Sequence, residues 1–162
     1  MSFDWGVMSN EGNIPPSAAV VDRWGDDILE SLDEPASYHR AIAAVPDAIA
    51  NVICVELLDW QVRNGGFHQY FYKSYGIMIH RAIQGFEAIW LLECATIARS
   101  ARAQFGDHFP ESRESRIPVV GPIDDEKMSF DAADDAYYAI GMGEMHAVLD
   151  AYAEAAMKDM WQ

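Results

Sequence analysis

The sequence predicts an all-α protein, a single-domain multi-helix bundle with a long loop near residues 106–128. Three observations favour this fold class. The 162 residues fit one domain, and with 51% apolar and 12% aromatic residues they can bury roughly 70% of the surface of the unfolded chain. Apolar side chains recur at three- and four-residue spacing over most of the chain. The sequence contains no internal repeat, Walker-type loop or dinucleotide-binding fingerprint.

Residues 1–16 contain glycines and prolines and are expected to form an N-terminal arm, whereas residues 17–162 form the helical domain. Ser17 is expected to cap a helix that runs to about Leu32 and ends before Pro35. The apolar residues of this helix fall on one half of its surface. Its acidic residues fall on the other half, and they are Asp22, Asp26, Asp27, Glu30, Asp33 and Glu34. On an unbroken helix they span roughly 18 Å, with one carboxylate every ~3 Å, close to the about 3.4 Å between the phosphates of one DNA strand.

A short helix is expected over residues 37–44, followed by a long helix over residues 46–63. The long helix is apolar on almost every side, which is typical of a helix at the centre of a bundle. The run Asn64-Gly65-Gly66 is expected to end it in a helix-to-helix turn, because glycine adopts the left-handed conformation without a Cβ penalty. Asn64 and Gln69 are expected to satisfy buried backbone groups around this turn.

The second half of the chain continues the helical pattern. The expected elements are a short aromatic helix over 67–74, one or two helices over 77–105 with a bend near Gly85, the loop 106–128, a helix over 130–139 capped by Ser129, and a last helix over 144–160. The loop contains three prolines and two glycines and shows little periodicity. A loop of this length is either functional or wraps over the core.

The charge is distributed unevenly along the chain, whose net charge is −15. Residues 1–35 contain eight acidic residues and one arginine, a net charge of −7. Residues 36–105 contain five acidic and six basic residues, a net charge of +1, and residues 106–162 contain thirteen acidic and four basic residues, a net charge of −9. This distribution argues against direct binding of nucleic acid, whose phosphates it would repel, and favours a cationic partner.

Several features bear on location and cofactors. No apolar run is long enough for a membrane span and the N-terminus lacks the pattern of a signal peptide, so we expect a cytoplasmic protein. Cys54 and Cys94 lie in apolar helical stretches and are expected to be buried, reduced thiols. The acidic run that begins at Asp124 fails the spacing of a calcium loop, and the five histidines show no ligand spacing. We therefore expect no metal and no cofactor.

Glu56, Asp59 and His68 suggest another function class, a hydrolase or metal-dependent enzyme with a site near the Gly65-Gly66 turn. Glu56 and Asp59 have the i, i+3 spacing of ligands carried by one helix. However, the sequence contains no second pair of this kind and no serine or cysteine in a recognisable nucleophile motif. We expect a protein that is not an enzyme; the alternative requires a cleft that exposes all three side chains.

The run of residues 58–71, LDWQVRNGGFHQYF, resembles the hallmark of a bacterial family of small helical proteins that is named for a DNA-mimic member. The similarity continues over residues 81–89 and 130–138 and spans about residues 46–155 in all. The hallmark residues are Asp59, Trp60, Asn64, Gly65, Gly66, Phe67, Gln69 and Phe71. The chain departs from the family pattern at Trp90, where the family carries a small residue.

The resemblance implies an all-α fold, often dimeric. In at least one branch of the family it also implies a negative surface that imitates duplex DNA and occupies a DNA-binding protein such as a transcriptional repressor. The hallmark itself is expected to be structural, so the mimicry depends on the acidic residues.

We therefore expect an acidic binding protein that occupies the DNA-binding surface of a basic partner, such as a transcriptional regulator. The candidate partner-binding residues are the six acidic residues of the first helix and a second strip of Asp124, Asp125 and Glu126. They would pair with the arginines and lysines that otherwise hold phosphates, and we expect folding to join the two strips into one ridge. A third alternative is an acidic protein whose charge only maintains solubility.

Overall fold

The computed structural model describes residues 13–161, so most of the predicted arm, residues 1–12, lies outside the described residues. Over residues 13–161 the chain folds into nine α-helices and one 3-10 helix, with no strand, which confirms the all-α fold class. The elements in order are α1 (Pro16–Trp24), α2 (Asp26–Glu30), α3 (Pro35–Ala43), α4 (Asp47–Tyr72), the 3-10 helix η2 (Ser74–Met78), α5 (Ile79–Ala88), α6 (Leu92–Ala103), α7 (Arg113–Val120), α8 (Asp131–Tyr138) and α9 (Met142–Asp159).

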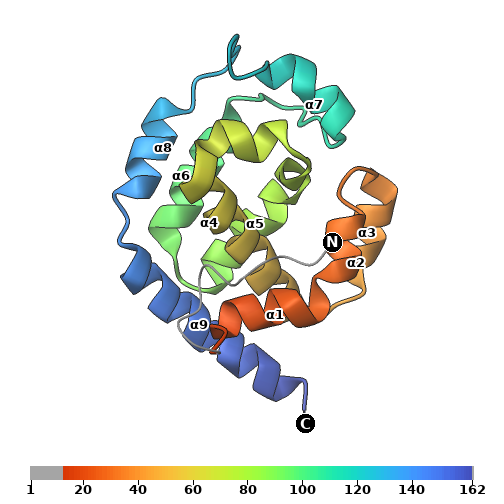
Figure 1. Cartoon of the computed structure of the whole chain (residues 1–162), viewed down its shortest axis with the longest axis vertical. Helices are drawn as coiled ribbons and strands as arrows, with labels where there is room; N and C mark the ends of the chain where they lie inside the picture. The colour runs from red at the N-terminus through yellow and green to blue at the C-terminus, as the bar shows by residue number, and fades with distance from the viewer. Residues whose placement is uncertain (1–12, 162) are drawn as a thin grey trace.

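Helix α4 forms the centre of the molecule, and α1, α5, α7, α8 and α9 pack around it (Figure 1). Every residue from 49 to 59 is buried, which confirms the prediction of a central helix that is apolar on almost every side. The prediction that the run Asn64-Gly65-Gly66 interrupts this helix at a glycine with positive φ is confirmed, because Gly66 has φ 77° and ψ 178°. The first helical segment extends to Gly65, two residues past the predicted end at Arg63, and the next segment follows directly, so the two are joined by a kink and together form α4.

The predicted helix over residues 17–32 is divided at Gly25 into α1 and α2. Helix α1 begins at Pro16, which needs no amide hydrogen-bond partner at a first helical position, and the cap predicted at Ser17 is absent. Ser17 instead lies inside the helix, and its backbone N–H donates to Asp150 Oδ1 of α9 over 3.0 Å. Because of the break at Gly25, the spacing calculated for an unbroken helix does not apply to the six acidic residues.

The predicted bend near Gly85 is also wrong. Gly85 lies inside α5, where a Cβ atom would come within 2.8 Å of the Val55 side chain, so the glycine allows α5 to pack closely against α4. The break falls after α5, where Trp90 has φ 67° and a side chain that is 79% exposed. A tryptophan in the left-handed region is strained, because its Cβ atom crowds the backbone there.

The segment 106–128 connects α6 to α8 as predicted, but it contains helix α7, which the sequence did not predict. Ser112 caps α7 by accepting a hydrogen bond from Ser115 N–H over 3.1 Å. Arg116 of α7 is fully buried and donates to the carbonyl oxygens of Phe71 and Lys73 at the end of α4, over 2.6 and 2.8 Å. It also donates to the carbonyls of residues 110 and 111. The bonds to Phe71 and Lys73 satisfy carbonyl oxygens that the end of α4 would otherwise leave without partners.

Helices α8 and α9 lie within two residues of their predicted bounds. The predicted cap at Ser129 is absent, because Phe130 occupies the N-cap position of α8 and the Ser129 carbonyl accepts from Gln104. Met145 and Leu149 of α9 face the core as predicted. Within residues 13–161, no helix combines the length and the apolar composition that crossing a membrane requires.

Candidate functional site

The first acidic strip, Asp22 to Glu34, follows α1, α2 and the start of α3, and all six of its acidic side chains are exposed. Among residues 13–161, no ion pair involves Asp22, Asp26, Asp27 or Glu30. The one arginine in this part of the sequence, Arg23, turns toward aromatic rings. Its guanidinium carbon lies 5.0 Å from the ring centre of Trp24 and 4.2 Å from that of Trp161. Arg23 therefore forms no ion pair with these four carboxylates.

Asp33 and Glu34 have structural partners. The Glu34 side chain caps α3, where it accepts from the backbone N–H groups of Ala36 and Ser37 over 3.3 and 3.0 Å. Hydrogen bonds from the Ser37 side chain and backbone hold the pKa of Glu34 below its ordinary value. Asp33 accepts a hydrogen bond from the Ser74 hydroxyl. Glu34 therefore lies at the favourable, positive end of α3.

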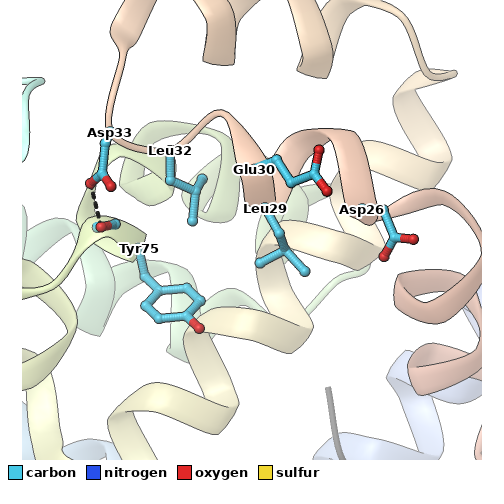
Figure 2. A pocket seen from close by; sticks show the side chains of 7 residues that line it. Asp26, Leu29, Glu30, Leu32, Asp33 and Tyr75 are labelled. Carbon is cyan, nitrogen blue, oxygen red and sulfur yellow. Dashed lines mark hydrogen bonds between the residues drawn. The ribbon is translucent and has the colours of Figure 1, made fainter. Parts of the chain in front are cut away.

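A hollow of about 280 Å³ opens beside α2, between this helix and η2 (Figure 2). Leu29, Leu32 and Tyr75 form its apolar surface, and Asp26, Glu30 and Asp33 surround it. The first acidic strip therefore borders a concave surface as well as open solvent.

The second strip, Asp124, Asp125 and Glu126, is exposed in the connection between α7 and α8. In Figure 1 this connection lies at the top of the molecule, whereas α1 and α2 lie in its lower half, with α3 and α7 on the path between them. The expected single ridge is therefore wrong: folding leaves two separate acidic surfaces, one on α1 and α2 and one between α7 and α8.

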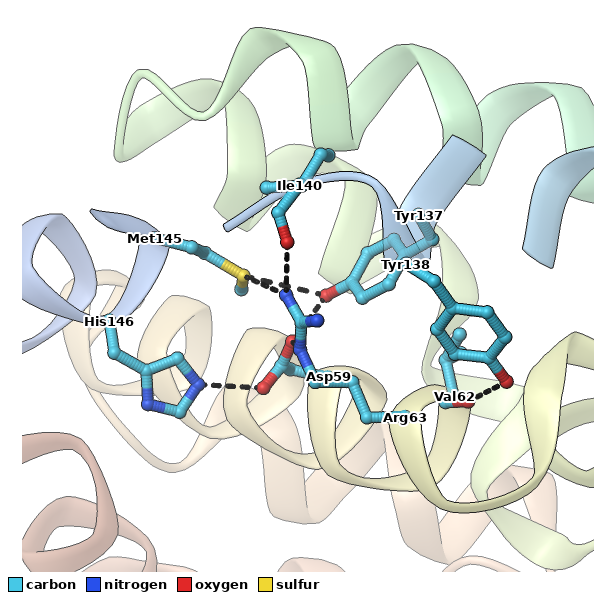
Figure 3. Close-up of polar contacts among 8 residues, drawn as sticks. All are labelled: Asp59, Val62, Arg63, Tyr137, Tyr138, Ile140, Met145 and His146. Carbon is cyan, nitrogen blue, oxygen red and sulfur yellow. Dashed lines mark hydrogen bonds and ion pairs between the residues drawn. The ribbon is translucent and has the colours of Figure 1, made fainter. Parts of the chain in front are cut away.

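Asp59 lies in a buried polar network (Figure 3). Its Oδ1 accepts from Arg63 Nε and from the Tyr137 hydroxyl, each over 2.7 Å, and its Oδ2 lies 2.7 Å from His146 Nε2. Burial alone would raise the pKa of Asp59, but the hydrogen bonds from His146 and Tyr137 hold it below its ordinary value. The hydrogen bond to Asp59 raises the pKa of His146. These contacts link α4, α8 and α9.

The other two residues of the enzyme hypothesis are also enclosed. Glu56 is 2% exposed, and burial raises the pKa of its carboxyl group to about 7. His68 is 8% exposed, and its Nε2 lies 2.8 Å from the carbonyl oxygen of Gly121. The cleft that this hypothesis requires would expose Glu56, Asp59 and His68 together, but each of the three side chains is buried. In the part of the chain that the structure describes, no three potential ligands are grouped for a metal ion.

The hallmark run forms the kink of α4. The kink leaves Phe67 N–H outside the helical ladder, and this group donates to Asp134 Oδ1 of α8 over 2.8 Å. A Cβ atom on Gly66 would lie 2.5 Å from Asp134 Oδ2, so both the backbone angle and the space require glycine there. The prediction that Gln69 satisfies a backbone group is wrong, because its amide donates to Gln61 Oε1 over 3.0 Å.

The remaining hallmark residues differ in burial. Phe67 and Phe71 are fully buried and pack in the aromatic core, and Trp60 is half-buried. Asn64 and Gly65 are exposed. Sequence reasoning missed the structural roles of Asp134, Tyr137, His146 and Arg116. The similarity of residues 130–138 to the family was the available signal for Asp134 and Tyr137, whereas no pattern in the sequence indicated His146 or Arg116.

Comparison with known proteins gave one match. A protein-family model described as DMP19-like protein, where DMP19 denotes DNA mimic protein 19, matches residues 43–156. Neither the comparison with curated proteins nor the comparison with solved structures found a match. The matched range contains the kink of α4 and helix α8, whereas the first acidic strip lies before it.

Proposed function

The chain belongs to the DMP19-like protein family, and from this membership we propose that it imitates DNA and occupies the DNA-binding surface of a basic protein, such as a transcriptional regulator, in the cytoplasm. The family is a DNA-mimic family and not an enzyme family. In this role the chain binds a protein partner and makes no direct contact with nucleic acid.

The observation that carries the proposal is the open acidic surface of α1 and α2. Asp22, Asp26, Asp27 and Glu30 are exposed, and no ion pair with any of residues 13–161 occupies them. Carboxylates of this kind can accept charge-assisted hydrogen bonds from the arginines and lysines that contact phosphates. Occupation of those cations by this chain would block DNA competitively.

Asp33 and Glu34 contribute less directly in this proposal, because each already holds a neighbouring segment in place. Asp124, Asp125 and Glu126 form a second contact surface. Because this surface lies apart from the first, one continuous DNA-like ridge does not describe the molecule, and a partner would engage the two surfaces at different points.

The proposal is tested in two steps. The chain is first used to isolate a DNA-binding protein from the native cell extract, and the purified partner is then bound to its labelled DNA site. We expect the wild-type chain to displace the DNA in a fluorescence anisotropy assay. A variant with Asp22, Asp26 and Asp27 changed to Asn and Glu30 to Gln should need at least about ten-fold more protein for the same displacement, because it lacks four charged contacts.

The matched control carries Asp107→Asn, Glu114→Gln, Glu154→Gln and Asp159→Asn, four exposed positions outside both strips. It has the same net charge as the test variant, and we expect it to displace DNA like the wild type. Equal losses in both variants would mean that net charge alone acts, and would contradict the proposal in favour of an acidic protein without mimicry.

We also propose that the chain forms a homodimer, as the family resemblance implies. The exposed apolar side chains of Trp90, Leu92 and Val148 surround a hollow of about 360 Å³, and gathered apolar side chains on a surface favour protein–protein contact. Light scattering should give the mass of a dimer for the wild type and for the control Ile123→Ser, but of a monomer for Trp90→Ser. A monomeric wild type would contradict this proposal.

A further inference from the structure

We infer that the buried carboxyl group of Glu56 is a pH-sensitive switch, which releases α1 when the group loses its proton. Helix α1 carries Asp22, the start of the first acidic strip. The consequence for partner binding rests on the proposed function, because α1 forms part of the surface that is proposed to bind the basic partner. The release of α1 is a property of the fold and is measured without the partner.

Glu56 lies where three helices meet. It belongs to α4, and α1 and α9 pack against α4 and against each other (Figure 1). Its side chain is 2% exposed, and its Oε2 has no hydrogen-bond partner among residues 13–161. From α1, Ser17 faces this carboxyl group, and the Ser17 hydroxyl is likewise buried without a hydrogen-bond partner among those residues. An enclosed carboxyl oxygen without a donor disfavours the anionic form of the group.

The charged groups around Glu56 also disfavour its anionic form. His146 and Asp150 of α9 face it, and Asp59 lies three residues after it on α4. His146 and Arg63, the cations at this junction, are both bound to Asp59, over 2.7 Å each. The carboxylates of Asp59 and Asp150 oppose a further negative charge beside them. Burial is the main cause that raises the pKa of Glu56 to about 7, so the proton is lost near neutral pH.

Helix α1 is the element best able to uncover Glu56. It has nine residues, whereas α4 has 26 and α9 has 18. Its apolar side and the bond from the Ser17 N–H to Asp150 hold it in place. It brings no charge to Glu56, because Asp22 is exposed and Arg23 lies over two aromatic rings. A helix of this length is not stable alone in water, so release of α1 would unfold it and leave Asp22 without a fixed position.

Loss of the proton and release of α1 are linked. Release exposes Glu56 to water, where its pKa returns toward the ordinary value of 4.5. The proton therefore favours the attached state. This contribution is complete at low pH and is lost as the pH rises from the pKa of the exposed group to that of the buried group, which changes the equilibrium between attached and released α1 by at most about 300-fold.

The test is hydrogen exchange of the full chain, followed by mass spectrometry and expressed as protection relative to the intrinsic exchange rate at each pH. We expect the amides of residues 17–24 to be less protected than those of residues 49–59, because α1 opens while α4 stays folded. Between pH 5.5 and 8 the protection of residues 17–24 should fall by about 25-fold. The protection of α7 should stay constant, because α7 can open while Glu56 remains buried.

Two variants that each remove one charge identify the titrating group. Glu56→Gln keeps the shape of the side chain and should remove most of the pH dependence in residues 17–24, whereas Glu154→Gln, at an exposed position of α9, should keep it. A ¹³C NMR titration of the Glu56 carboxyl group in the wild-type chain needs no variant and should give a midpoint near 7.

Four results would each overturn the inference. They are equal protection of residues 17–24 and 49–59, constant protection of residues 17–24 in the wild type, a pH dependence that persists in Glu56→Gln, and a carboxyl midpoint near 4.5. The first would mean that α1 leaves only when the whole molecule unfolds.

The partner assay separates this switch from the proposed function. If both are right, the wild type should lose more of its ability to displace DNA between pH 6 and 8 than Glu56→Gln does with the same partner. If the protection of α1 follows the pH but no DNA is displaced at any pH, the switch stands and the proposed function fails. If DNA is displaced but the protection of α1 is constant, only the switch is wrong.

Discussion

The backbone N–H of Phe67 donates a hydrogen bond of 2.8 Å to the carboxylate of Asp134. This contact joins α4 to α8 across 67 positions of sequence, and it connects two of the segments that resemble the family. The kink at Gly66 creates the unpaired N–H, and the carboxylate satisfies it. The glycine pair and Asp134 thus form one structural unit that orients α8 against the central helix.

Asp134→Ala should lower the free energy of unfolding by about 1–3 kcal/mol, because the Phe67 N–H would be left buried without a partner. Urea denaturation measures the change. The control is Asp135→Ala on the same helix, whose side chain is exposed and should matter little. Equal losses for the two variants would show that the general charge of α8, and not the bond to Phe67, is important.

Gly66→Ala should destabilise the protein by at least about 2 kcal/mol. The backbone angles of Gly66, φ 77° and ψ 178°, lie in a region that is almost restricted to glycine, and the new methyl group would collide with Asp134. Gly143→Ala is the control, because a Cβ atom there meets no atom within 4 Å. An unchanged urea midpoint for Gly66→Ala would contradict this account of the kink.

Arg116→Lys should lower the free energy of unfolding by roughly 3 kcal/mol, although the charge is kept. Arg116 is fully buried and donates to four carbonyl oxygens, which a lysine with three donors on one nitrogen cannot reach together. Burial lowers the pKa of Arg116 to about 10, so the group remains cationic at neutral pH. Arg113→Lys, which removes a donor to the single carbonyl of Tyr72, should cost much less in the same denaturation experiment.

Stability should fall as the pH rises from 5 to 8. Burial raises the pKa of Glu56 from 4.5 to about 7, so the folded state holds this proton more tightly than the unfolded state does. The proton on Glu56 therefore adds on the order of 3 kcal/mol to the free energy of unfolding at low pH. This contribution is lost as the pH rises from the pKa of the unfolded state to that of the folded state. His146, whose pKa is raised by its bond to Asp59, contributes with the same sign.

Glu56→Gln should remove most of this decline, because the glutamine keeps the shape of the side chain but does not titrate. Glu154→Gln, at an exposed position, provides the matched control for the loss of one charge. Urea denaturation at one-unit steps of pH measures the slope. A slope for Glu56→Gln as steep as that of the control would show that Glu56 is not the titrating group.

The affinity for the DNA-binding partner should depend less on salt than the affinity of the same partner for DNA does. Duplex DNA releases condensed counterions, which gives a log–log slope near −0.9 for each neutralised phosphate, whereas a folded protein with fewer, fixed carboxylates condenses fewer ions. Titrations of the partner with the chain and with DNA at several salt concentrations compare the two slopes. An equal or steeper slope for the chain would count against mimicry.

The sequence predicted the features that depend on local pattern. Residues 49–59 are apolar on almost every side of the helix, which identified α4 as the central helix, and the glycine pair identified the place where it bends. It did not predict α7, because this helix is held by Arg116 and by carbonyls of α4 that are distant in the sequence. Likewise, periodicity continued through Gly25 and concealed the break there, so the acidic residues were placed on one straight helix.

The candidate site shows the same limit. The sequence identified which carboxylates are exposed, since polar residues opposite an apolar face point to solvent. It could not separate Asp33 and Glu34, which bind Ser74 and the start of α3, from Asp22, Asp26 and Asp27, for which residues 13–161 provide no ion pair. Nor could it show that two acidic segments with similar charge lie apart.

The pairing of α1 with α9 determines when the molecule can finish folding. The N–H of Ser17 meets Asp150, and the ring of Trp161 covers Arg23, so the first helix is held by the last one. During synthesis, α1 and the apolar side of α4 must wait for residues made at the end. Until then the apolar sides of α1 and α4 that pack against α9 stay exposed, and a shortened product that lacks α9 should aggregate.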